Sequence, residues 1–232
     1  MWSPLLLVLT ASAPLIYAVH LGRNGSGDNY IPKYNWHKPQ GNCDLSNAKL
    51  PVVPGINFTT TSDRPRHPRA LGLGVGVQNY TCTAAGTYGA LGAVAQLFDI
   101  SCLYSTSSFN TLPSLALMLQ QQRLLRASAI TALALGHHYF VNFNGTLSPR
   151  FDITKDKQPP PSRYIIAKRI AGFKAPVNPA QNVDWLQLAR ISGHFSKLVY
   201  RVETAGGQAP ATCTPGSGDI SVSYAAQYWF FN

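Results

Sequence analysis

Alternating hydrophobic and polar residues dominate the last third of the chain. Two such runs, 198–204 and 220–231, flank a loop that is rich in glycine and proline and contains Cys213. A period of two residues is typical of β-strands, and the glycines and prolines mark the turn between them. The sequence therefore predicts two strands around a loop that is held by a cysteine.

Further runs upstream predict five more strands. They lie at 71–82, 90–100, 139–143, 164–173 and 185–191. The first carries glycine at alternate positions, which removes side chains from one face and lets another segment approach closely. Short strands separated by turns predict an antiparallel β-sandwich or barrel.

The hydrophobic period changes between residues 111 and 135. Leucine and isoleucine recur there at helical spacing, Pro113 suits the first turn of a helix, and Gly136 is placed to end it. We expect one amphipathic helix, or two short ones, with Arg123 on the solvent side. The predicted fold class is therefore mainly β, a sandwich or barrel with one helical insertion at about 111–135.

The N-terminus predicts export. Residues 5–18 are mainly apolar and end in the small residue Ala18. This segment is too short to span a bilayer and is typical of a secretory signal peptide. We expect a signal peptide at 1–18, an irregular N-terminal arm at 19–70 and a single β-rich domain at 71–232, with no membrane span.

Sequons and cysteines agree with export. Asn24, Asn57, Asn79 and Asn144 each begin an N-x-S/T tripeptide and are candidate N-glycosylation sites. The cysteines are Cys43, Cys82, Cys102 and Cys213, whose spacing matches no zinc pattern. An even number of cysteines in an exported chain predicts two disulfides, and the spacing leaves all three pairings open.

The chain is basic, with a formal net charge of +10. Such a charge attracts nucleic acid, membranes or acidic polysaccharide. The densest basic run, 64–69, is broken by two prolines and has no interleaved aromatic residues, so it predicts a solvated loop and no nucleic-acid partner. Cell-wall or other acidic polysaccharide is the partner that we expect.

Several segments together carry a recognisable pattern. They are GVGVQNYTC at 74–82, GAVAQLFD at 92–99, HYF at 138–140, WL at 185–186, VYRVETAGGQAP at 199–210 with Cys213, and YAAQYWF at 224–230. In this order they resemble a family of secreted fungal and bacterial proteins catalogued as domain of unknown function three-four-five-five. The resemblance covers most of 71–232, and the helical stretch is similar to a fungal-type insertion.

The resemblance implies a β-rich extracellular domain and supplies no catalytic residue. It favours the pair Cys82–Cys213, because both cysteines lie in family-like pieces, and so leaves Cys43–Cys102. Some fungal members carry a malate dehydrogenase label. The alternating glycines at 72–76 lack the strand-turn-helix setting and the ribose-binding acid of a dinucleotide site, so we predict no cofactor and no NAD-dependent malate dehydrogenase.

The histidines are the first candidates for metal chemistry. His137 and His138 are neighbours on a predicted strand and point to opposite faces, so we favour one packed and one exposed side chain over a metal site that includes His138 and His67. His20 would chelate copper if it became the N-terminal residue, but cleavage after Ala18 is the better match. No metal is predicted.

The remaining candidates favour structural roles. Arg201 and Glu203 lie two apart on a predicted strand and are expected to pair, while Asp99 and Asp184 are expected in turns or caps. On alternating strands, half of the C-terminal aromatic residues are expected to form core and the rest ordinary surface, with a flat face that stacks on sugar rings as the alternative.

These observations predict a secreted glycoprotein. The function that we favour is a non-catalytic extracellular or cell-wall-associated module that binds polysaccharide. The alternative is a secreted enzyme that acts on cell-wall polymers by hydrolysis or by copper-dependent oxidation.

Overall fold

A computed structural model describes residues 43–58, 67–123, 135–153 and 163–232, all within one compact unit that begins at Trp36. Its strands are β1 (Ala70–Cys82), β2 (Tyr88–Asp99), β3 (Gly136–Phe143), β4 (Thr146–Asp152), β5 (Tyr164–Phe173), β6 (Trp185–Gly193), β7 (Leu198–Gly206) and β8 (Ile220–Phe231). The predicted signal peptide, His20 and Asn24 lie outside the described residues.

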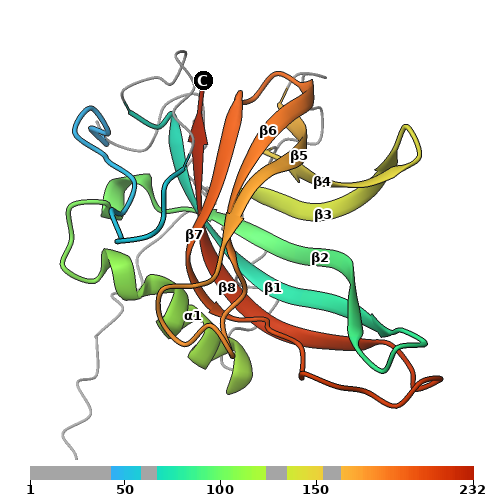
Figure 1. Cartoon of the computed structure of the whole chain (residues 1–232). Helices are drawn as coiled ribbons and strands as arrows, with labels where there is room; N and C mark the ends of the chain where they lie inside the picture. Colours follow the sequence, from blue (N-terminus) through green and yellow to red (C-terminus); the bar gives the residue numbers. More distant parts are fainter. Residues whose placement is uncertain (1–42, 59–66, 124–134, 154–162) are drawn as a thin grey trace, which may run out of the picture. The chain divides into compact units, whose positions relative to one another are not determined.

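Each strand pairs antiparallel with the next one, and β8 pairs with β1, so the sheet closes into a barrel (Figure 1). The predicted mainly β fold is confirmed, with the barrel as its form. The sequence patterns missed β4, which contains Pro149. This proline is tolerated because β4 pairs with β5 only at Arg150–Asp152, and an unpaired strand edge does not need the missing N–H donor.

The alternating glycines of β1 make room for close neighbours: rings from β8 lie over Gly72 and Gly74, and the backbone of β2 approaches Gly76. A Cβ atom on Gly74 would lie 2.5 Å from Cε2 of Tyr228, and one on Gly72 would lie 3.4 Å from Cε2 of Phe230. A Cβ atom on Gly76 would collide with the Val94 carbonyl group of β2. The close approach predicted for this face is confirmed, and the glycines make room for the β8 rings.

Hydrophobic residues are buried on both sides of the barrel wall. Inside lie Tyr224, Tyr228 and Phe230, and outside lie Tyr200 and Trp229 among others. Trp185, Tyr200, Tyr224, Tyr228, Trp229, Phe230 and Phe231 are all buried. The predicted core role is confirmed for half of these aromatics, but the other half, expected at the surface, is buried as well, because the outer layer of the protein covers that side of the wall. These seven residues therefore form no exposed face for sugar rings.

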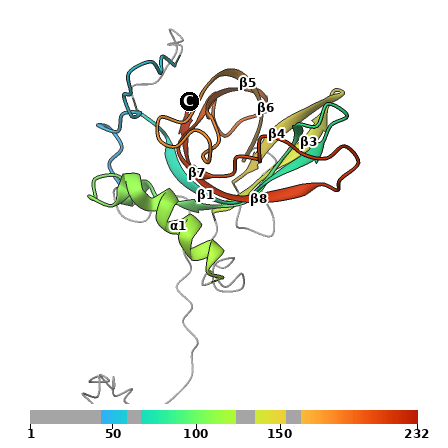
Figure 2. The same ribbon diagram turned by 60° about the horizontal axis from the view of Figure 1, so that its bottom comes forward.

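The outer layer consists of the N-terminal segment 43–58, the short turns η1 (Ser101–Leu103) and η2 (Phe109–Thr111), and the helix α1 (Leu112–Gln121). α1 lies against β8, β1 and β7 (Figure 2). Pro113 occupies its first turn as predicted, but the helix ends at Gln121, and residues 124–134 lie outside the described residues. No helix in the described part of the chain is long and apolar enough to cross a membrane.

A buried amide fixes this outer layer to the barrel. Gln227 of β8 donates from Nε2 to the Phe109 carbonyl at 2.9 Å, and its Oε1 accepts from Nε1 of Trp229 at 3.0 Å. Both hydrogen-bonding groups of the amide are therefore satisfied where the wall of the barrel meets η2, as burial of a polar group requires.

Two disulfides hold the loops, Cys82–Cys213 and Cys43–Cys102. The pairing favoured by the family resemblance is confirmed. Cys82–Cys213 joins the end of β1 to the long β7–β8 loop, and the Cys213 N–H donates to the Gly86 carbonyl in the β1–β2 turn at 2.9 Å. Cys43–Cys102 joins the N-terminal segment to η1.

The packing of β1 predicts unequal effects of two identical substitutions. Gly76→Ala should lower the free energy of unfolding by about 1–3 kcal/mol, because its Cβ atom meets the backbone of β2. Gly72→Ala is the matched control, with its nearest contact at an ordinary 3.4 Å and the same change in the unfolded chain. Denaturant titration measures both, and equal stabilities would contradict the packing described.

Candidate functional site: a basic cavity in the barrel

The barrel encloses a cavity of about 680 Å³ that is lined by residues from all eight strands. Its lining includes apolar side chains from several strands, such as Leu147, Leu186 and Leu188, together with a smaller set of polar and charged groups. Small-molecule sites in proteins have this size and this mixture of many apolar and few polar groups.

The β3–β4 hairpin leaves the cavity open at one side. β3 pairs with β2 only through Gly136–His138, and β4 pairs with β5 only through Arg150–Asp152. Beyond these residues the hairpin diverges from its neighbours, as the yellow strands in Figure 1 show. Thr146–Pro149 of this diverging part line the cavity together with Ala90 of β2.

His138 is a buried residue of the cavity lining. Its ring stacks on Phe151, with the ring centres 4.2 Å apart, and its Nδ1 donates to the Arg150 carbonyl at 2.9 Å. Burial lowers the pKa of His138 to about 4, so the ring is neutral at neutral pH. His137 is exposed, which confirms the prediction of one packed and one exposed histidine.

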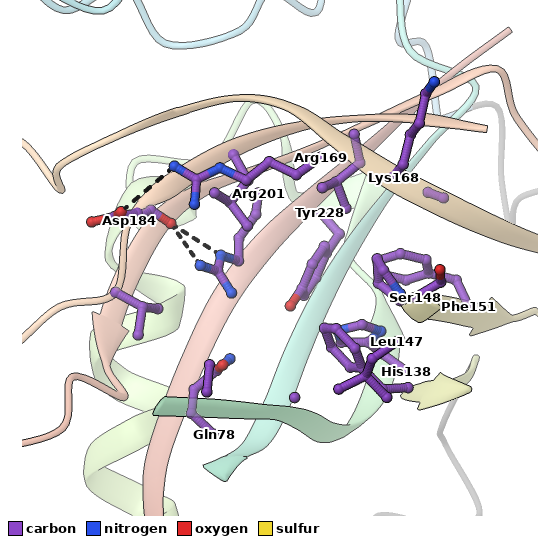
Figure 3. Close-up of a pocket in the computed structure, with 18 of the residues that line it drawn as sticks. Gln78, His138, Leu147, Ser148, Phe151, Lys168, Arg169, Asp184, Arg201 and Tyr228 are labelled. Carbon is purple, nitrogen blue, oxygen red and sulfur yellow. Dashed lines mark hydrogen bonds and ion pairs between the residues drawn. The ribbon is translucent and has the colours of Figure 1, made fainter. Parts of the chain in front are cut away.

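Arg201 is the buried cation of the cavity lining among the described residues. It projects from β7 with 9% of its surface exposed, and its Nε and Nη2 donate to the Asp184 carbonyl at 3.0 and 2.9 Å (Figure 3). No Asp or Glu side chain in the described part of the chain forms an ion pair with it. The other N–H groups of its guanidinium face the cavity.

The predicted ion pair between Arg201 and Glu203 is wrong. The register of β7 against β8 shifts between Val202 and Ala205, and Glu203 has φ 47°, so the alternation of faces is broken at that point. Glu203 is half-buried, and burial raises the pKa of its carboxyl group. A β-bulge of this kind is not visible in a strand-like residue pattern.

Three more cations lie around the cavity. Lys174 Nζ is 3.4 Å from Asp184 Oδ1, Arg169 Nη2 is 4.0 Å from Asp184 Oδ2, and Lys168 is exposed on the same strand as Arg169. With Arg201, four cationic side chains line the cavity against one carboxylate. The predicted turn role holds for Asp99, which accepts from the Ser101 N–H at 2.9 Å, whereas Asp184 belongs to the cavity wall.

Neutral donors complete the polar part of the lining. Gln78 of β1 is 7% exposed, and its buried Nε2 has no hydrogen-bond partner within the described residues. The Tyr228 and Tyr224 hydroxyls are 2.9 Å apart, and burial raises the pKa of both, so both keep their protons. Figure 3 shows the Gln78 amide, the Arg201 guanidinium and the Tyr228 hydroxyl directed toward one space.

The other predicted site residues lie away from this cavity. His67 is exposed, and within the described ranges no three His, Cys, Asp or Glu side chains gather as a metal site would require. Asn57 and Asn144 are exposed, whereas Asn79 lies within β1 and its Oδ1 accepts from the Ser221 hydroxyl at 2.7 Å. Glycosylation at each of these positions stays a prediction.

Arg69, from the predicted solvated loop, has a structural contact. Its Nη1 donates to the Phe195 carbonyl at 2.8 Å, and its guanidinium carbon lies 4.7 Å from the centre of the Phe195 ring. Phe195 packs in turn on Phe230, with the ring centres 5.3 Å apart. Arg69 therefore helps to hold the aromatic packing inside the barrel.

Gln78, Arg201 and Tyr228 were not predicted as site residues. Each lies on an alternating strand, in β1, β7 and β8, and faces inward. The available signal was a polar or cationic residue at an inward position of a hydrophobic strand. That signal identifies a cavity only once the strands are known to close into a barrel.

The fold and the site define a class: a closed meander barrel of eight antiparallel strands with a basic internal cavity. The family described as "Protein of unknown function (DUF3455)" matches residues 64–232, which include all eight strands. The chain belongs to this family, as its sequence motifs indicated. No curated protein and no solved structure matches the chain.

The buried histidine predicts an acid-sensitive fold. Because the pKa of His138 is about 4 in the folded chain and 6.5 when unperturbed, its contribution is complete above pH 6.5 and is lost as the pH falls toward 4. The free energy of unfolding should drop by about 3 kcal/mol over this range from His138 alone. His138→Phe keeps a ring against Phe151 and should lose this part of the pH dependence.

Denaturant titrations of both proteins from pH 7 to pH 4 measure the difference. The wild type and the variant share all other titrating groups, so their stability difference isolates His138. Parallel pH profiles would show that His138 does not titrate as a buried neutral group.

Proposed function

We propose that this protein is a secreted, non-catalytic binding module whose barrel cavity holds a small organic anion. The observation that carries this proposal is Arg201, a nearly buried cation without a carboxylate partner in the described part of the chain. A buried charge is costly unless it is paired, and an anionic ligand supplies that pairing.

The hydrogen bonds that Arg201 makes within the protein leave it able to bind an anion. Its Nε and Nη2 both donate to one backbone carbonyl, that of Asp184, which holds the guanidinium in place without neutralising it. A guanidinium has five N–H groups in a planar fork, so further donors stay available to a ligand. The protein thus holds the cation in position, and an anionic ligand would neutralise its charge.

The remaining lining supports an organic ligand. Phe140, Leu147, Leu186 and Leu188 offer apolar surface to a carbon skeleton. Lys168, Arg169 and Lys174 are exposed around the cavity, where they raise the local concentration of anions by long-range attraction. This attraction weakens with salt, because exposed charges are screened.

Secretion is supported by the signal-peptide pattern, the sequons and the two disulfides, which persist in oxidising compartments. In that setting, the acidic polysaccharide expected from the net charge stays a proposed partner. The C-terminal aromatics are buried, so any contact with a polymer chain would rely on the exposed cations rather than on ring stacking.

A fluorescence titration with 8-anilinonaphthalene-1-sulfonate, an organic anion, tests the proposal. The wild type should bind this probe with an affinity that falls as salt rises. Arg201→Met should weaken binding roughly 10- to 100-fold, the value of a charge-assisted hydrogen bond.

Arg190→Met is the matched control, because Arg190 is an exposed arginine of β6. It should bind the probe as the wild type does, and circular dichroism should confirm that both variants keep the fold. Equal affinities for the wild type and Arg201→Met would rule out the cavity as the anion site.

A further inference from the structure

We infer that the ligand is a carboxylate with a flat apolar body, bound with its carboxylate inward against Arg201, Gln78 and Tyr228. This inference rests on the proposed function and specifies the chemical class of its ligand. It follows from the kind of donors that meet in the cavity and from the shape of the surface beside them.

The buried amide of Gln78 supports this inference independently of Arg201. A buried amide nitrogen without a partner costs free energy in the empty protein, and such groups are rare in folded chains. The Cγ of Gln78 lies 3.1 Å from the position of a Cβ atom on Gly207, so packing against the end of β7 holds its stem. The unpartnered Nε2 is therefore a fixed donor rather than a mobile surface group.

Tyr228 adds a hydroxyl beside the same space. Its oxygen is 2.9 Å from the Tyr224 hydroxyl, so Tyr224 can donate to it and leave the Tyr228 proton for an acceptor in the cavity. Burial raises the pKa of Tyr228 and the nearby charge of Arg201 lowers it, so the hydroxyl and the guanidinium lie close together in the cavity lining.

These donors match a carboxylate. A planar guanidinium, an amide N–H and a hydroxyl offer hydrogen atoms to the two oxygens of one planar head group. The neutral His138 ring and Phe151 lie stacked nearby, and Phe140 lies over Gly92 near the diverging hairpin. These flat aromatic surfaces favour a ligand body that is itself flat.

The direction of binding follows from the position of the charges. Arg201 is buried inside the barrel, whereas Lys168, Arg169 and Lys174 are exposed. The exposed cations attract the anion, and Arg201 receives its head group, so the apolar body extends toward the opening beside the β3–β4 hairpin. There it would contact Leu147, which is 51% exposed.

Calorimetric titration with 2-naphthoate and with its neutral analogue 2-naphthamide tests this assignment. The wild type should bind naphthoate at least tenfold more tightly than naphthamide. Gln78→Leu should weaken naphthoate binding by about tenfold, the value of a hydrogen bond to a charged group.

Gln78→Leu has a second expected effect that a merely structural residue would not show. Because it removes a buried Nε2 that has no partner within the described residues, the variant measured without ligand should have a melting temperature equal to or above that of the wild type. Gln121→Leu, at an exposed position of α1, is the matched control and should change neither property.

The outcomes separate the two proposals. If naphthoate and naphthamide bind equally, or if Gln78→Leu binds naphthoate as the wild type does, the carboxylate assignment is overturned while anion binding stands. If neither naphthoate nor 8-anilinonaphthalene-1-sulfonate binds the wild type, both proposals are overturned.

Discussion

The main physical constraint on this structure is a guanidinium group that is buried inside a β-barrel. Arg201 is 9% exposed and is held by a backbone carbonyl rather than by a carboxylate. Burial in a medium of low polarity makes its charge costly, and the same environment strengthens its attraction for an anion. Under the proposed function, the cavity gives an anion access to this charge, and the exposed cations attract the anion to the cavity.

β1 and β8 are neighbouring strands that contribute unequally to the packing inside the barrel. β1 has no side chains at Gly72 and Gly74, where rings from β8 fill the space, nor at Gly76, where the backbone of β2 approaches closely. The outer faces of the same strands are covered by α1 and by the segment tied down through Cys43–Cys102. The part of the barrel wall formed by β1 and β8 is therefore packed on both of its faces, and it borders the cavity through Gln78 and Tyr228.

Much of the fold was predictable because most strands show a local alternation of hydrophobic and polar residues. β5 and β8 have the predicted bounds, since both are long alternating runs between turn residues. β4 was missed because Pro149 lies in the middle of the segment, and proline is unusual inside a strand. Only its pairing with β3 and β5 in the barrel identifies the segment as a strand. The site was not predictable, because its polar groups come from β1, β7 and β8, and because the bulge at Glu203 breaks the alternation from which an ion pair was expected.

The most direct measurement is a pair of crystal structures of the protein, one from material purified without added organic acids and one with a carboxylate present. We expect the Arg201 guanidinium to keep its hydrogen bonds to the Asp184 carbonyl in both crystals, and an anion to contact its remaining N–H groups in the second. An Arg201 side chain turned out of the barrel, or paired with a carboxylate of the chain itself, would contradict the account.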